Sequence, residues 1–238
     1  MNYRWDWGIL LQDPYWGWLW SGLGWTVALS LASWLLALAI GMAMGVAGAM
    51  PLRGMRALAA IYVHLFRNVP PLVQLFLWFF VVPELLPDAM GLWIKRDLPF
   101  PEFSTSVVAI GLYAGARVTE QVKAGIDAVA IRLLSPALAT GMRPFQAFRL
   151  ILLPLGLRAV IKPLTSEALI TMKLSAMSLT VGVLEITAES RHVENYTFHG
   201  FEAFTVATVV YLLIGLVITG AMLTIDARLN AYRLAERR

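Results

Sequence analysis

The sequence predicts an all-α, polytopic membrane protein. Of its 238 residues, 59% are hydrophobic and only 14% are charged, whereas a soluble domain is about half apolar and about a quarter charged. Five segments are long and apolar enough to cross a bilayer, which takes about 20 residues. Nine tryptophans and seven tyrosines favour a protein with two membrane interfaces, where amphipathic rings gather. We expect one membrane domain over residues 1–238.

The first element is an outer interfacial segment, residues 1–20, rich in tryptophan. It lacks the basic start, short apolar run and cleavage site of a signal peptide. The first span, 21–50, follows inside the charge-free stretch Pro14–Leu52. Small residues at every fourth position of this span allow a neighbouring helix to approach closely, either from the same chain or from another subunit. These residues are Ser33, Ala37, Gly41, Gly45 and Ala49.

Four more spans follow, and three of them contain residues that lipid disfavours. Arg67 and Pro70–Pro71 interrupt the second span, and the fifth is free of charges. The third contains Arg117 and Glu120, and the fourth contains Glu167 and Lys173. These four spans are predicted at 58–82, 104–126, 163–184 and 203–225.

The distribution of lysine and arginine predicts the orientation of the chain. With the C-terminus in the cytoplasm, twelve of the nineteen basic residues fall in cytoplasmic segments and four in outer segments. Cytoplasmic loops carry the excess of positive charge. We therefore expect the N-terminus outside, the C-terminus in the cytoplasm, and the loop 134–154 on the cytoplasmic face.

The loop 134–154 contains the pattern of a short helix. Ser135 is a good N-cap, and the ring of Pro136 presets the first helical dihedral angle. Gly141 and Pro144 are expected to end the helix after about two turns of 3.6 residues each. A helix of this size suits docking into the groove of a partner protein. A surface helix resting on the membrane is the alternative, because apolar residues with flanking arginines suit a bilayer as well.

The same loop resembles the signature of the permease subunits of ABC importers. That signature is Glu-Ala-Ala, three residues, Gly, nine residues, and then Ile-x-Leu-Pro. Ser135 and Pro136 stand in place of the family's Glu-Ala, so the acidic contact with the ATPase is missing here. The resemblance implies a type I importer permease fold of about five spans with a short cytoplasmic coupling helix. It assigns ATPase docking to Ser135, Pro136, Ala137, Leu138, Ala139, Gly141, Arg143, Ile151, Leu153 and Pro154.

Other stretches are similar to the polar amino acid subfamily of these permeases. They are FRNVPPLVQLF from Phe66, ARVTEQVKAGI from Ala116 and PLTSEALITMKLSAMSLTVGVLEIT from Pro163. WSGLGWTVALS, LFRNVP, VVPELLP and ARVTEQV resemble the permeases of glutamate/aspartate importers in particular. The likeness covers most of the chain. It implies import of polar amino acids, with glutamate and aspartate as the expected substrates and glutamine or another polar amino acid as the alternative.

Charged groups inside the spans point to a substrate passage. Ionisable side chains at membrane depth face a cavity or one another, because their exposure to lipid is costly. Arg117 and Glu120, three residues apart, either neutralise each other or line the passage together with Lys173. The basic groups would attract the carboxylates of the substrate. Three hydroxyls on the helix of Lys173 complete the predicted passage, namely those of Thr171, Ser175 and Ser178.

The sequence predicts a transporter subunit without catalytic residues. None of its four lysines follows a glycine, so the phosphate-binding G-x-x-x-x-G-K-[ST] loop is absent, and we expect ATP to be bound by a partner rather than by this chain. The lack of cysteine excludes a thiolate metal site, and the three histidines have no metal-ligand spacing. We expect no cofactor and no metal in this chain.

The resemblance also implies the partners and the location. They are an ABC ATPase dimer, a second permease subunit that is either identical or related, and an outer solute-binding protein, in a bacterial inner membrane and without nucleic acid. Whether this chain itself holds a substrate site is left open. Two rival functions are an ion-coupled secondary transporter, for which inverted repeats are typical and none is visible here, and a membrane scaffold that transports nothing.

Overall fold

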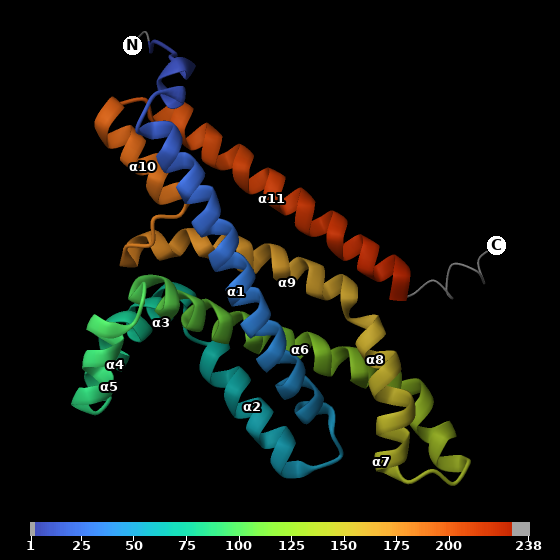
Figure 1. Ribbon diagram of the computed structural model, residues 1–238. Coiled ribbons are helices and arrows are strands. Elements are labelled where there is room, and N and C mark those ends of the chain that lie inside the picture. The colour runs from blue at the N-terminus through green and yellow to red at the C-terminus, as the bar shows by residue number, and fades with distance from the viewer. Residues whose placement is uncertain (1–2, 230–238) are drawn as a thin grey trace, which may run out of the picture. The chain divides into compact units, whose positions relative to one another are not determined.

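The computed structural model describes residues 3–229. Residues 230–238, with three of the arginines counted for the orientation, and residues 1 and 2 lie outside the described part. Between residues 3 and 229 the chain is helical and contains no strand (Figure 1), which confirms the predicted all-α class. The α-helices are α1 Tyr15–Ala49, α2 Arg53–Arg67, α3 Pro71–Phe76, α4 Val82–Leu85, α5 Asp88–Leu92, α6 Pro101–Ala139, α7 Pro144–Ala147, α8 Leu153–Ala159, α9 Ile161–Leu174, α10 Ile186–Thr197 and α11 Gly200–Leu229.

Shorter helical segments of other pitch join several of these helices. The two tightly wound 3-10 segments are Trp7–Leu11 and Ser175–Val181. The three wider π-helical segments are Leu77–Val81, Trp93–Asp97 and Phe148–Leu152.

Among the described residues, two helices, α1 and α11, are each long and apolar enough to cross a membrane, by length and composition. Two bent pairs would bring the number to four if each pair is one span. Helix α2 meets Pro71–Leu85 at 95°, and Ile161–Val181 meets α10 at 48°. The first bend follows from Pro70 and Pro71, because the residue before a proline is pushed out of the helical region. The predicted span 58–82 is therefore sharply broken.

Helix α6 contains the predicted span 104–126 and continues well beyond it. Its 39 residues extend ~58 Å at 1.5 Å per residue, whereas the hydrocarbon core of a bilayer is about 30 Å thick. Helix α6 is not among the described helices that are apolar enough to cross a membrane, and it is longer than an upright span would need to be.

The chain divides into two compact units, and each has its own core. The first unit comprises residues 3–33, 71–110 and 170–217. Its core contains Leu19 of α1, Ile186 and Val193 of α10, and Ala203 and Ala207 of α11. The backbone N–H of Ile186 donates to Thr26 Oγ1 at 3.0 Å, which fixes the start of α10 on α1.

The second unit comprises residues 34–70, 111–169 and 218–229. In it, the small residues of α1 pack against α6 of the same chain. A Cβ atom added to Gly41 would lie 2.5 Å from Val118, and one added to Gly45 would lie 2.5 Å from Val122. Of the two partners considered for this ridge, the structure therefore places a helix of the same chain against Gly41 and Gly45.

The start of the predicted docking helix is wrong. Ser135 and Pro136 do not begin a new helix; they lie inside α6, which runs unbroken to Ala139. A proline inside a helix removes one backbone hydrogen bond. Starting a separate helix is the costly step, however, whereas an existing helix continues at little cost. The helix predicted for docking thus coincides with the last turn of α6.

Gly141 ends α6 in a Schellman motif. It has φ +89°, its N–H donates to the carbonyl of Leu138 at 3.0 Å, and Met142 N–H donates to the carbonyl of Ala137 at 3.3 Å. These two bonds satisfy carbonyls at the helix end, and only glycine adopts this dihedral angle without strain. Pro144 was expected to stop a helix but begins α7, where its missing N–H has no partner to lose.

The docking segment, residues 134–154, is anchored in the core of the second unit. Phe148 and Leu152 pack with Val118, Val122 and Ile126 of α6. The π-helical segment that carries them ends directly before Leu153 and Pro154, as expected where a proline interrupts the regular hydrogen-bond ladder. The docking segment and α6 therefore share one core.

Candidate functional site

Arg117 and Glu167 form the most buried ion pair among the described residues of the second unit. Arg117 Nε donates to Glu167 Oε2 at 2.7 Å, and Nη2 donates to Oε1 at 3.1 Å. The Glu167 side chain is 4% exposed and the Arg117 side chain 31%. Such a fork holds the guanidinium plane in one orientation, so the face of Arg117 that remains exposed is presented in a defined direction.

Glu120 does not neutralise Arg117, although the two residues lie three apart on one helix. It pairs instead with Arg67 at the end of α2, and both side chains of that pair are exposed. The interpretation that Arg117 and Glu120 pair with each other is therefore wrong. Each has found a partner on a different helix, because the tertiary fold brings a better-placed charge to it.

The structure separates Lys173 from the three predicted hydroxyls. Thr171, Ser175 and Ser178 are fully buried, and Ser175 Oγ donates to the carbonyl of Met172 at 2.7 Å. Lys173 is exposed and makes no ion pair with any residue between 3 and 229. The three hydroxyls therefore do not share the exposed face of Lys173. That they line the passage stays a prediction.

Of the four buried carboxylates that were not assigned a role from the sequence, two accept hydrogen bonds from a residue of another helix. One is Glu167. The sequence signal that could have indicated its role is an acidic residue at membrane depth with no basic residue at helical spacing. The other is Glu185, which is fully buried and accepts hydrogen bonds from the backbone N–H groups of Thr187 and Ala188 at 2.9 Å. Tyr211 Oη also donates to Glu185 at 2.7 Å. Glu185 thus caps α10 and ties it to α11.

The docking segment presents an apolar surface edged by positive charge. Leu138, Phe145 and Leu150 are exposed, as are Arg143 and Arg149. These side chains are held on a rigid base, because neighbouring residues of the same segment are in the core. The surface is suited to a partner with an apolar groove and an acidic rim.

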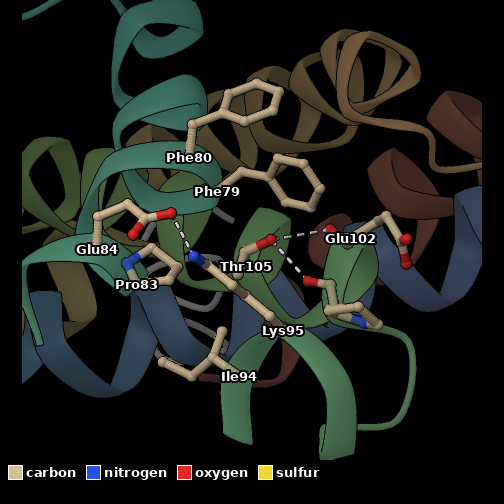
Figure 2. Close-up of a pocket in the computed structure, with 9 residues that line it drawn as sticks. Phe79, Phe80, Pro83, Glu84, Ile94, Lys95, Glu102 and Thr105 are labelled. Atoms are coloured by element: carbon tan, nitrogen blue, oxygen red, sulfur yellow. Dashed lines mark hydrogen bonds and ion pairs between the residues drawn. The ribbon is translucent and has the colours of Figure 1, made fainter. Parts of the chain in front are cut away.

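A pocket of about 230 Å³ lies in the first unit between α4, the Trp93–Asp97 segment and the start of α6. Figure 2 shows the Lys95 ammonium turned toward the Glu84 carboxylate, with which it forms an ion pair, beside the rings of Phe79 and Phe80. The cation of this pocket is thus paired with a carboxylate of the same pocket. The sequence had assigned no role to these residues.

Possible metal-binding side chains do not form a cluster in the part of the chain that the structure describes. Across residues 3–229, no three histidine, aspartate or glutamate side chains gather as a metal centre would require.

The sequence of the chain matches a known family of membrane transport proteins. The family described as "Binding-protein-dependent transport system inner membrane component" matches residues 36–231. The chain belongs to this family. It is thus an inner membrane component of a transport system and not an enzyme, as the sequence had predicted, and membership implies a binding protein and further transport subunits as partners.

Relatives within the family handle amino acids. The glutamate/aspartate import permease protein GltJ of Escherichia coli strain K12 is 38% identical over 97% of both chains. The probable amino-acid ABC transporter permease protein PatM of Vibrio harveyi is 28% identical over 73% of this chain and 74% of its own length. These likenesses agree with the resemblance to polar amino acid permeases noted in the sequence.

The fold of this inner membrane component is shared with solved transporters. A crystal structure of an amino acid ABC transporter with histidines matches with a TM-score of 0.77. It covers 96% of this chain and all of that chain, at 22% sequence identity. The predicted importer permease fold is thereby confirmed.

Proposed function

We propose that the chain is the permease subunit of an ABC importer for acidic amino acids, glutamate and aspartate. The observation that carries the substrate is the 38% identity to a glutamate/aspartate import permease over 97% of both chains. The forked Arg117–Glu167 pair supports it, because a guanidinium held in place at membrane depth is a suitable partner for a carboxylate.

Arg117 is the residue we place first in the passage. A guanidinium has five N–H donors, and Glu167 takes two of them. Tyr113 shares a further hydrogen bond with Arg117, and the donors left on the exposed face would contact the side-chain carboxylate of a substrate. Glu167 holds the fork steady and offsets its charge, so that the passage attracts the substrate without trapping it.

Lys173 is the second basic group proposed for the passage. A lysine at membrane depth requires water or a polar partner, and Lys173 has no ionic partner among residues 3–229. A second permease subunit, identical or related, would enclose the exposed side of Lys173 and complete the path. Glu120, exposed in its pair with Arg67, would lie on the same wall as Arg117.

The docking segment is the proposed link to the ATPase pair. Closure of the ATPase subunits around ATP would displace residues 134–154, and the packing of Phe148 and Leu152 on α6 would pass this displacement to the helix that carries Arg117. ATP is bound by the partner, and this chain needs no cofactor. The binding protein would deliver the amino acid from outside, where we place the N-terminus, while the C-terminus stays in the cytoplasm.

Uptake into vesicles tests this function. The chain is reconstituted with its ATPase, its second permease and its binding protein, and entry of labelled glutamate, aspartate and glutamine is measured with and without enclosed ATP. We expect ATP-dependent uptake of glutamate and aspartate, about tenfold faster than that of glutamine, which corresponds to about 1.4 kcal/mol.

Two other results would assign a different function. Uptake driven by a sodium or proton gradient without ATP would make the chain part of a secondary transporter. ATP-dependent uptake that favours glutamine would keep the importer and refute the acidic substrate. A chain that binds its partners yet moves no amino acid would be a scaffold.

A further inference from the structure

A cavity of about 410 Å³ lies in the first unit, where α10 ends and α11 begins. Its walls are largely aromatic and include Tyr3, Phe198, Phe201 and Phe204. Glu194 is the one charged residue that lines it. This cavity shares no residue with the passage or with the docking segment.

Glu194 is a carboxylate without a partner inside residues 3–229. Its side chain is half-buried, and neither a hydrogen bond nor an ion pair joins its carboxylate to another described residue. A partly buried charge requires compensation. Aromatic faces attract cations through their negative π-surfaces. Since no basic side chain lines the cavity, the ligand that fits is a cation, and an anion is disfavoured.

Hydrogen bonds to Glu202 hold the N-terminal part of the aromatic wall in place. Tyr3 Oη donates to the carboxylate of Glu202, which is fully buried, and Asp6 N–H donates to the same carboxylate at 2.8 Å. Partial burial and the bond to Glu202 raise the pKa of the Tyr3 hydroxyl to about 12, so it remains a donor at neutral pH. The rings of Tyr3 and Phe201 meet edge to face at 4.8 Å.

The cavity opens onto the apolar face of a membrane-spanning helix. Phe201, Thr205 and Thr208 are exposed on one face of α11, and the same face continues at intervals of four residues through Leu212 and Leu216. Leu212 is 61% exposed and Leu216 is 60% exposed. From Phe201 to Leu216 this face extends ~22 Å, more than the half-thickness of about 15 Å of a bilayer core.

We propose that this cavity binds the ammonium headgroup of a phospholipid, with phosphatidylethanolamine as the simplest example. The ammonium group would lie against Glu194 and the ring faces of Tyr3 and Phe201, and one acyl chain would follow Leu212 and Leu216 along α11. A lipid fits both parts of the site, because its charge and its apolar chain are joined at the membrane interface where α11 starts. A peptide segment of another protein would match the cavity but not the exposed face below it.

Lipid binding to the purified, intact importer complex tests this site. Native mass spectrometry of the complex in micelles that contain equal amounts of phosphatidylethanolamine and phosphatidylglycerol measures the preference for the ammonium lipid. We expect about a tenfold preference, in the range of a desolvated cation–π contact. Glu194→Gln should reduce the preference below about twofold, and Glu194→Lys should reverse it. Asp88→Asn, which removes an exposed carboxylate of the same unit, is the matched control and should leave the preference unchanged.

The source of the ammonium group is tested by competition. Free phosphoethanolamine, which lacks the acyl chains, should compete at least about a hundredfold less well than the lipid, since burial of each methylene stabilises binding by about 0.8 kcal/mol. Equal competition would refute the acyl part of the site. An unchanged preference in Glu194→Gln would refute the headgroup part. If Glu194→Gln weakened binding of the solute-binding protein or the second permease instead, the cavity would be a protein contact and the proposal would be wrong.

Discussion

At the level of single residues, the charges within the membrane differ in what holds them. Arg117 is bound at two nitrogen atoms to a nearly buried carboxylate, whereas Arg67 contacts an exposed one. The first pair fixes a direction in space. The second pair is exposed, and its surroundings must be water or a partner subunit, because an exposed ion pair is costly in lipid.

This difference predicts unequal effects of the same substitution. Arg117→Lys keeps the charge but loses the planar fork, and we expect glutamate uptake at limiting concentration to fall about tenfold, equivalent to about 1.4 kcal/mol. Arg67→Lys is the control and should change uptake less than about twofold, since exposed ion pairs contribute about 0–1 kcal/mol. Initial rates in proteoliposomes measure both. Similar rates for the two variants would mean that the fork has no role in transport.

At the level of helices, close approach between α1 and α6 organises the second unit. In lipid, helices associate through packing rather than exclusion of water, and glycine lets two backbones come near. Gly41 and Gly45 lie directly against Val118 and Val122. The same valines pack on Phe148 and Leu152 of the docking segment, so this contact is also part of the path that we propose from the ATPase to Arg117.

Adding one methyl group at this contact should destabilise the chain. In Gly41→Ala the new Cβ would lie 2.5 Å from Val118 and 2.8 Å from the carbonyl oxygen of Gly115. We expect a loss of about 1–3 kcal/mol, typical of an overpacked core, seen as a lower unfolding temperature in detergent. Gly220→Ala on α11, which meets no atom within 4 Å, should leave that temperature unchanged or slightly raised. An unfolding temperature as high for Gly41→Ala as for the control would contradict the packing.

At the level of the whole molecule, the orientation in the membrane decides which partner each surface meets. In the proposed orientation the docking segment lies on the cytoplasmic side, where the ATPase would be, and the α5 region lies on the outer side. Both assignments follow from the excess of basic residues in the segments taken as cytoplasmic.

Single cysteines can test this orientation, because the chain contains none of its own. We expect Arg143→Cys to react with a membrane-impermeant maleimide only after the cells are opened. Asp88→Cys should react in intact cells, since it lies in a segment predicted to be outside. Both positions are exposed, so access to the reagent is the variable measured. Reaction of Arg143→Cys in intact cells would reverse the orientation and exclude docking of a cytoplasmic ATPase at this segment.

The all-α membrane fold and the family were predictable from the sequence. Apolar composition and span length follow directly from what lipid requires of a chain, and Gly141 ends its helix through its own backbone geometry. Local chemistry is sufficient for such features, because the causes lie within a few residues along the chain.

The partners of the charged groups were decided only by the tertiary structure. Sequence spacing suggested Glu120 as the partner of Arg117. In the folded chain Arg117 pairs with Glu167 of α9, and Glu120 pairs with Arg67 of α2. The same is true of the start at Ser135, which has all the signals of an N-cap and yet lies inside a longer helix. An ion pair depends on distances in space and a helix start depends on what precedes it, and packing between segments far apart in the chain determines both.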